Sequence, residues 1–310
     1  MNNPAYLAWM GGSILLSFGL FLLLGRGCNN RGRLAACAIV PAVLLGAACS
    51  KLLYMLLQLD YVLADGWDTL LLSASPEHFS FIGGILGVCL AILLAAKLVK
   101  VPPMKALNAF APAGLLLATL ARFGEGFLAQ EFMTGTGPYM EEGSPLCFFP
   151  ISVNCSTDPE WQEWYLSVFL IEGVFLLAAA VISLVCFKKG RFIRSLFLLC
   201  LPQVICENLL NNIFWWIFCI RVEQLLYMVV MTVILIIYAI RARGWKYRLL
   251  PVIVAAACAG LFIIAEFAME QKIEFLSFLS VRDCYMLMGL GTAALLFTEI
   301  FASRKAHLQA

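Results

Sequence analysis

The chain alternates between long apolar stretches and short polar connections. Nine of the apolar stretches run for about 20 residues, the length at which a helix crosses the hydrocarbon core of a bilayer. Within that core only a helix satisfies all of its own backbone hydrogen bonds. The predicted fold is therefore all-α, a polytopic membrane helix bundle of about nine transmembrane helices. The expected spans are 7–24, 34–57, 79–98, 106–128, 162–187, 193–218, 222–240, 249–268 and 284–303.

The connections alternate in charge. Lys and Arg follow the first, third, fifth, seventh and ninth spans, whereas 58–78 and 129–161 contain acidic residues and neither Lys nor Arg. Basic residues remain on the cytoplasmic side of a membrane. We therefore expect the N-terminus outside and the C-terminus in the cytoplasm.

Composition agrees with a membrane protein. The chain is 63% hydrophobic and 13% charged, whereas a soluble domain carries about 25% charged residues. A net charge of +2 is too small to favour a nucleic acid as partner. The first span follows an uncharged start without a cleavage site, so we expect it to be retained. We find no metal-ligand spacing, P-loop or G-x-S-x-G turn, and we expect no cofactor.

Two of the expected outer segments are long enough to have a role. Residues 58–78 hold aromatic residues suited to an arm in the membrane interface. Residues 129–161 form a small expected cap that contains Cys147 and Cys155. On the oxidising side of a membrane these two cysteines are compatible with a disulfide and equally with two free thiols.

Polar residues gather near the expected outer ends of several spans. Glu207 and Asn211 are four residues apart, so they would share one helix face, as would Asn208 and Asn212. The expected cluster consists of His78, Gly83, Gly84, Arg122, Gly124, Glu125, Glu131, Glu172, Glu207, Asn208, Asn211, Arg221 and Gln224.

This composition suits an anionic ligand. An arginine with amide side chains can bind a phosphate through two hydrogen bonds. A nearby carboxylate can act as a general base or can neutralise the arginine. The alternative is structural: Arg122 and Glu125 would form an i, i+3 ion pair, and the asparagines would hold helices together.

Two stretches resemble the prolipoprotein diacylglyceryl transferase family. SFIGGILG (80–87) is similar to its S-F-H/Y-G-G-x-x-G pattern, and APAGLLLATLARFGEGFLAQE (111–131) is similar to a span ending in G-R-x-G-N-F-x-N-x-E. Looser similarities follow in the same order along the chain, in LLGAACSKLLY (44–54), FLIEGV (169–174) and 207–224. The resemblance covers about residues 1–240, a body of seven spans. Residues 241–310 would add two transmembrane helices and a short tail.

The resemblance implies a membrane enzyme of the bacterial inner membrane. It would move a diacylglyceryl group from phosphatidylglycerol to a cysteine thiol of a lipoprotein precursor at the outer leaflet. Arg122 would hold the phosphate with help from Arg221, and Glu125, Glu131 or His78 would accept the thiol proton. The glycines and the remaining polar residues of the cluster would bind the lipid.

The chain departs from the family pattern at several positions. Ile82 stands where the family has His or Tyr, and Glu125 stands where it has Asn. The family's E-F-F-R arginine has no counterpart, and Gln130 occupies the strict position of an acid. The alternatives are a relative that transfers a lipid group to another acceptor, or a non-catalytic lipid-binding protein. A solute transporter would need discontinuous helices or an inverted repeat, and the sequence contains neither.

Overall fold

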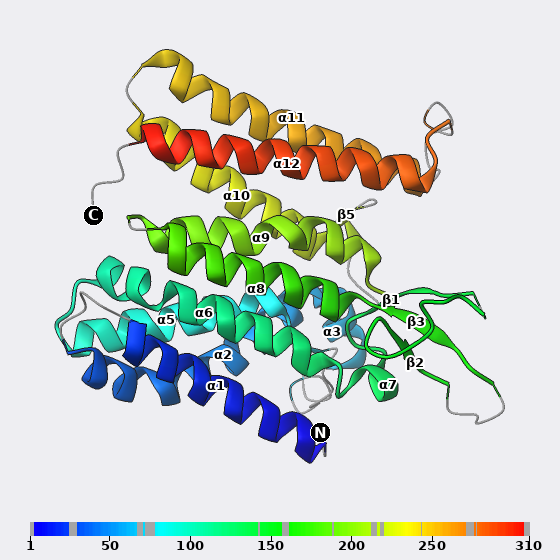
Figure 1. Cartoon of the computed structure of the whole chain (residues 1–310), viewed down its shortest axis with the longest axis horizontal. Helices are drawn as coiled ribbons and strands as arrows, with labels where there is room; N and C mark the ends of the chain where they lie inside the picture. The colour runs from blue at the N-terminus through cyan, green and yellow to red at the C-terminus, as the bar shows by residue number, and fades with distance from the viewer. Residues whose placement is uncertain are drawn as a thin grey trace. The chain divides into compact units, whose positions relative to one another are not determined.

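The computed structural model of the chain describes most of its length. The described residues are 3–24, 30–66, 71, 78–141, 143–156, 161–187, 189–211, 216–217, 220–242, 244–270, 276 and 278–306. Nine helices in this part are long and apolar enough to cross a membrane. They are α1 (Pro4–Leu24), α2 (Arg31–Leu57), α5 (Phe81–Leu98), α6 (Pro103–Glu125), α8 (Val168–Cys186), α9 (Arg191–Leu209), α10 (Val222–Arg241), α11 (Trp245–Met269) and α12 (Val281–Lys305). The prediction of a multi-pass membrane helix bundle is confirmed at this level (Figure 1).

The described chain divides into two compact units, and each is described by itself. The first comprises 1–186 and 209–214, and the second comprises 187–208 and 215–310. Helices α1, α2, α5, α6 and α8 belong to the first unit, and α9 to α12 belong to the second. The division expected from the family resemblance, at residue 240, stays a prediction.

Helices α2 and α5 pack with their backbones in contact. A Cβ atom added to Gly83 would lie 2.6 Å from the carbonyl oxygen of Cys49, and one added to Gly87 would overlap the Leu45 carbonyl. Small residues permit this approach between membrane helices. The Ser50 hydroxyl joins the same contact by donating to the carbonyl oxygen of Ser80 at 2.5 Å. The start of α5 is thereby fixed against α2.

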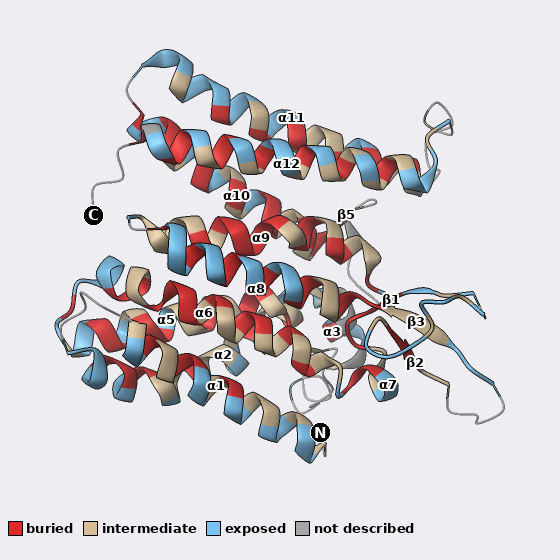
Figure 2. Cartoon of the chain, in the orientation of Figure 1, coloured by how far each residue is buried: buried red, intermediate tan, exposed pale blue. Residues whose placement is uncertain are grey.

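Helix α6 occupies the middle of the first unit. It packs against α1, α5 and α8. Much of the helix is buried (Figure 2), and its buried residues include Phe110 and Leu115. The ring of Trp9 on α1 donates from Nε1 to the Leu120 carbonyl at 2.7 Å. This contact holds the beginning of α1 beside the end of α6.

The segment expected to be a cap contains regular structure. A short helix, α7 (Ala129–Phe132), precedes a three-stranded antiparallel sheet in the order β1-β3-β2. The strands are β1 (Thr136–Tyr139), β2 (Ser152–Asn154) and β3 (Trp164–Ser167). The fifth expected span therefore begins too early, because Trp164–Ser167 pairs as a strand before α8 starts. Within the expected arm, α3 (Leu59–Asp65) is helical, whereas 67–70 and 72–77 lie outside the described residues.

The second unit gathers around α10, which packs against α11 and α12, while α11 and α12 pack along each other. Two antiparallel strands of two residues each, β4 (Trp216–Ile217) and β5 (Ile220–Arg221), precede α10. The sixth expected span, 193–218, is too long because α9 ends at Leu209. Many of the side chains on the outward faces are large, apolar and exposed, among them Ile240, Leu290 and Phe297. Such faces suit contact with lipid chains.

Candidate functional site

A buried arginine forms the centre of the polar group in the first unit. Arg122 lies in the last turn of α6, and its side chain is 6% exposed. Its Nη1 donates to Oε1 of Glu125 at 2.8 Å, and its Nε lies 2.5 Å from Oε2 of Glu172 on α8. The centre of the Phe81 ring, at the start of α5, lies 3.9 Å from the guanidinium carbon. Three helices therefore position one cation, and the expected i, i+3 pair with Glu125 is present.

The two carboxylates differ in their surroundings. Glu172 is fully buried, whereas the Glu125 side chain is 16% exposed. The second oxygen of Glu125, Oε2, has no hydrogen-bond partner among the described residues. It lies against Gly135, whose φ of +69° and lack of a side chain leave room for it. Glu125 therefore lies between Arg122 and the turn that leads from α7 into β1.

The expected glycines have separate roles. Gly83 packs on the backbone of α2, and a Cβ atom on Gly124 would lie 2.9 Å from the Trp9 ring. Both positions are therefore used for close packing within the protein. Gly84 is more open, because a Cβ atom there would meet only Ser50, at 3.9 Å. Of the three, only Gly84 leaves room for a ligand.

A second cation, which sequence reasoning missed, lies on α2 beside the segment that leads into α5. Lys51 on α2 is 8% exposed, and its Nζ lies 4.9 Å from the centre of the Phe79 ring. His78 lies on Tyr54, with ring centres 5.3 Å apart. The signal for Lys51 was a lysine inside an apolar span, within the stretch LLGAACSKLLY. The segment that leads into α5 thus presents Phe79 to one buried cation and Phe81 to another.

A second polar group lies within the second unit. Glu207 near the end of α9, Arg221 immediately before α10 and Gln224 in the first turn of α10 are all buried. Burial lowers the pKa of Arg221, and the nearby carboxylates of Glu207 and Glu266 oppose that effect. Glu266 on α11 is a member of this group that the expected cluster did not include.

The prediction that Asn211 shares a helix face with Glu207 is wrong. Asn211 lies beyond the end of α9. Its backbone N–H donates to the carbonyl of Thr136 at 2.9 Å, and its side chain donates to the carbonyl of Gly137. Pairing with β1 has replaced the next helical turn. Asn208 remains on α9, whereas Asn212 lies outside the described residues.

The segment from α7 to the start of α8 includes Glu131 and the two cysteines of the expected cap. Glu131 is exposed on α7. Cys147 and Cys155 are free thiols, so the structure has the open form of the two alternatives. Burial and the nearby Glu163 raise the pKa of Cys155 to about 11.

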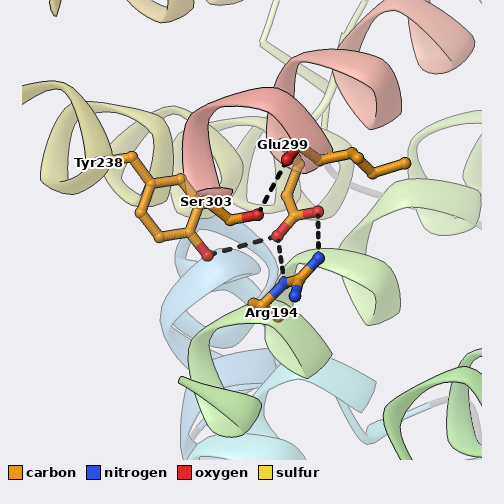
Figure 3. A network of polar contacts seen from close by, with 5 residues as sticks. Arg194, Tyr238, Glu299 and Ser303 are labelled. Carbon is orange, nitrogen blue, oxygen red and sulfur yellow. Dashed lines mark hydrogen bonds and ion pairs between the residues drawn. The ribbon is translucent and has the colours of Figure 1, made fainter. Parts of the chain in front are cut away.

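Another ion pair, between a partly exposed arginine and a buried carboxylate, lies at the opposite end of α9 from Glu207. Arg194 contacts Glu299 on α12, and the hydroxyl of Tyr238 on α10 lies 3.5 Å from the same carboxylate (Figure 3). The guanidinium also lies 3.9 Å from the centre of the Phe187 ring. This network joins three helices of the second unit.

The two polar groups thus belong to different units, and both are rich in carboxylates and basic or amide donors. In the described part of the chain no three His, Cys, Asp or Glu side chains gather in a way that would hold a metal ion. A comparison of the chain with family models, curated proteins and solved structures gives no match.

Proposed function

We propose that the chain is a transferase of the bacterial inner membrane that moves a diacylglyceryl group from phosphatidylglycerol to a cysteine thiol of a lipoprotein precursor. The observation that carries the proposal is the buried guanidinium of Arg122, which three helices position beside two carboxylates. An ionisable group in a membrane span is costly and usually has a function.

A carboxylate and Arg122 have separate parts in the proposed reaction. The thiol loses its proton to a carboxylate, and the thiolate attacks the glycerol carbon that carries the phosphate ester. A carbon–sulfur bond forms, the carbon–oxygen bond breaks, and glycerol phosphate leaves with the bonding electrons. Arg122 stabilises the charge that develops on the leaving phosphate, because a preorganised cation in a dry site acts most strongly there.

Glu125 is the better candidate for the base. A phosphate reaching Arg122 must share or replace one of its present partners. Glu125 is the more exposed of the two and lies at the end of its helix, whereas Glu172 is fully buried in α8. A phosphate that takes the place of Glu125 on Arg122 would leave the Glu125 carboxylate free to accept the proton of the thiol.

The test is replacement of the transferase in a living bacterium. The chain is expressed in cells depleted of their own enzyme, and lipoprotein-precursor mobility and labelled lipid incorporation are followed. Wild type and Arg282→Ala, which changes an exposed arginine, are expected to restore lipidation. Arg122→Ala is expected to lose it. A well-inserted wild type that transfers no lipid would show the proposal to be wrong.

One observation favours a second function, a lipid-binding protein without catalysis. Ile82 is buried at the position where the resembling family has His or Tyr, so that position offers no proton donor or acceptor. This alternative predicts phosphatidylglycerol bound to the purified wild-type protein, with no lipid on the precursor in the same cells.

A further inference from the structure

Glu266 of α11 lies within the polar group formed by α9 and α10. Its side chain is buried, and its Oε1 accepts a hydrogen bond from Nε2 of Gln224 at 2.7 Å and another from Nδ2 of Asn208. Helix α11 belongs to the pair of helices that lies outside the region of family resemblance. One carboxylate of this pair therefore holds two amide side chains of the preceding helices.

These contacts determine the orientation of the Gln224 amide. Its Nε2 faces two acceptors, the Glu266 carboxylate and the Val204 carbonyl at 2.9 Å. Its Oε1 must consequently point the other way. That oxygen is buried and has no hydrogen-bond partner among the described residues. A buried acceptor without a donor is unfavourable, which makes it a place where a ligand's donor is gained at little cost.

The same group contains a cation. Arg221 immediately precedes α10 and is buried near Glu207 and Glu266. Arginine binds phosphate oxygens through its fork of donors, whereas Gln224 Oε1 can only accept. A ligand that satisfies both combines a phosphate with a hydrogen-bond donor. A hydroxyl group supplies that donor without placing a second positive charge beside Arg221. Phosphatidylglycerol has such a head group, and so does free glycerol phosphate.

We propose that Arg221 and Gln224 form a subsite for a hydroxyl-bearing phosphate head group, and that Glu266 is a positioning residue that keeps Gln224 Oε1 turned toward the hydroxyl. The inference rests on the proposed function and adds to it a part for α11. It assigns head-group selectivity to Gln224 and its orientation to Glu266.

The test measures thermal stabilisation of the full purified chain in detergent. Four additives are compared: phosphatidylglycerol, phosphatidic acid (a phosphate without a head-group hydroxyl), phosphatidylcholine and soluble glycerol phosphate. Wild type is expected to respond more strongly to phosphatidylglycerol than to phosphatidic acid. A response to glycerol phosphate alone, without phosphatidylglycerol, would identify the soluble product as the occupant. Equal responses to phosphatidylglycerol and phosphatidic acid in the wild type would overturn the subsite, whatever the variants do.

Three variants separate positioning from folding. Glu266→Met keeps the side chain's length but removes the acceptor, and it should raise the phosphatidylglycerol concentration for half-maximal stabilisation about tenfold. Glu266→Gln retains one acceptor oxygen and should recover part of that loss. Glu141→Met makes the same change at an exposed position in the first unit and should leave the response unchanged. Full selectivity in Glu266→Met would refute the positioning role.

The two proposals fail in different ways. If the wild type distinguishes the lipids but transfers nothing in cells, the subsite stands and the transferase proposal is wrong. If the wild type transfers lipid but does not distinguish the head groups, the subsite is wrong and the transferase proposal stands.

Discussion

Arg194 on α9 and Glu299 on α12 form a two-point ion pair, with Nε 2.8 Å from Oε1 and Nη2 3.4 Å from Oε2 (Figure 3). Glu299 is 1% exposed, so its charge depends on this arginine. The pair ties the last helix of the chain to the first helix of the second unit.

Replacing one member of this pair should destabilise the second unit. Arg194→Met leaves the buried Glu299 without its cation, and the cost is expected to be about 2 kcal/mol, below the figure of about 3 to 5 kcal/mol for fully buried pairs because Arg194 is partly exposed. Thermal unfolding in detergent measures the loss. The double variant Arg194→Met/Glu299→Met should recover much of it, and equal losses in the single and double variants would contradict the argument.

The glycines that begin α5 should respond differently to the same small change. Gly83→Ala places a methyl group against the backbone of α2 and should cost about 1 to 3 kcal/mol, as overpacking does. Gly84→Ala meets only the Ser50 side chain at 3.9 Å and should be close to neutral. The two proteins are compared by thermal unfolding, and equal effects would show that the close contact does not determine tolerance.

Lys51 should contribute to transfer if the start of α5 borders the lipid phosphate. Lys51→Met removes a cation from the Phe79 face while it keeps a long apolar stem. We expect lipid transfer to fall about tenfold, corresponding to the loss of one charge-assisted contact. Lys97→Met, at an exposed position on the other end of α5, is the control. Unchanged transfer in Lys51→Met would assign this lysine to structure alone.

Cys155 should react slowly with thiol reagents, and its rate should depend steeply on pH. With a pKa of about 11, raised by burial and by Glu163, its reactive thiolate form is scarce at neutral pH. The alkylation rate should rise about tenfold per pH unit up to that pKa, because the thiolate fraction does. Peptide mass spectrometry in a Cys147→Ser background distinguishes this thiol from the exposed Cys37 and Cys186.

Glu163→Gln tests whether Glu163 raises the pKa of Cys155. Removing the nearby negative charge lowers the pKa of Cys155, so alkylation at pH 8 should become faster. Glu141→Gln, also exposed, removes a carboxylate that does not act on Cys155 and is the comparison. A slower reaction in Glu163→Gln would contradict the assigned cause.

The nine helices could be predicted because hydropathy is a local property of the chain. The ends of the helices were harder to predict. Helix α9 ends at Leu209 because Asn211 bonds to β1, a partner more than seventy positions earlier. The small sheet was missed since its strands are only three or four residues long. Arg122 was identifiable as a charge in an apolar span, and its pairing with Glu125 followed from spacing.

The partners of buried carboxylates could not be predicted in this way. Glu266 binds an asparagine 58 positions away, and Glu299 binds an arginine 105 positions away. In the sequence each is an acid in an apolar stretch that gives no sign of its partner. Only the packing of α9, α10, α11 and α12 shows which polar side chains each carboxylate meets.

The backbone contact between α2 and α5 has a consequence for bilayers of different thickness. Membrane helices usually adjust to a thinner or thicker bilayer by changing their tilt. Gly83 and Gly87 hold these two helices so closely that neither can lean without driving one main chain into the other. The pair must tilt as one body, carrying Lys51 and Phe79 with it, so the depth of that end of α5 is set by the pair's combined apolar length.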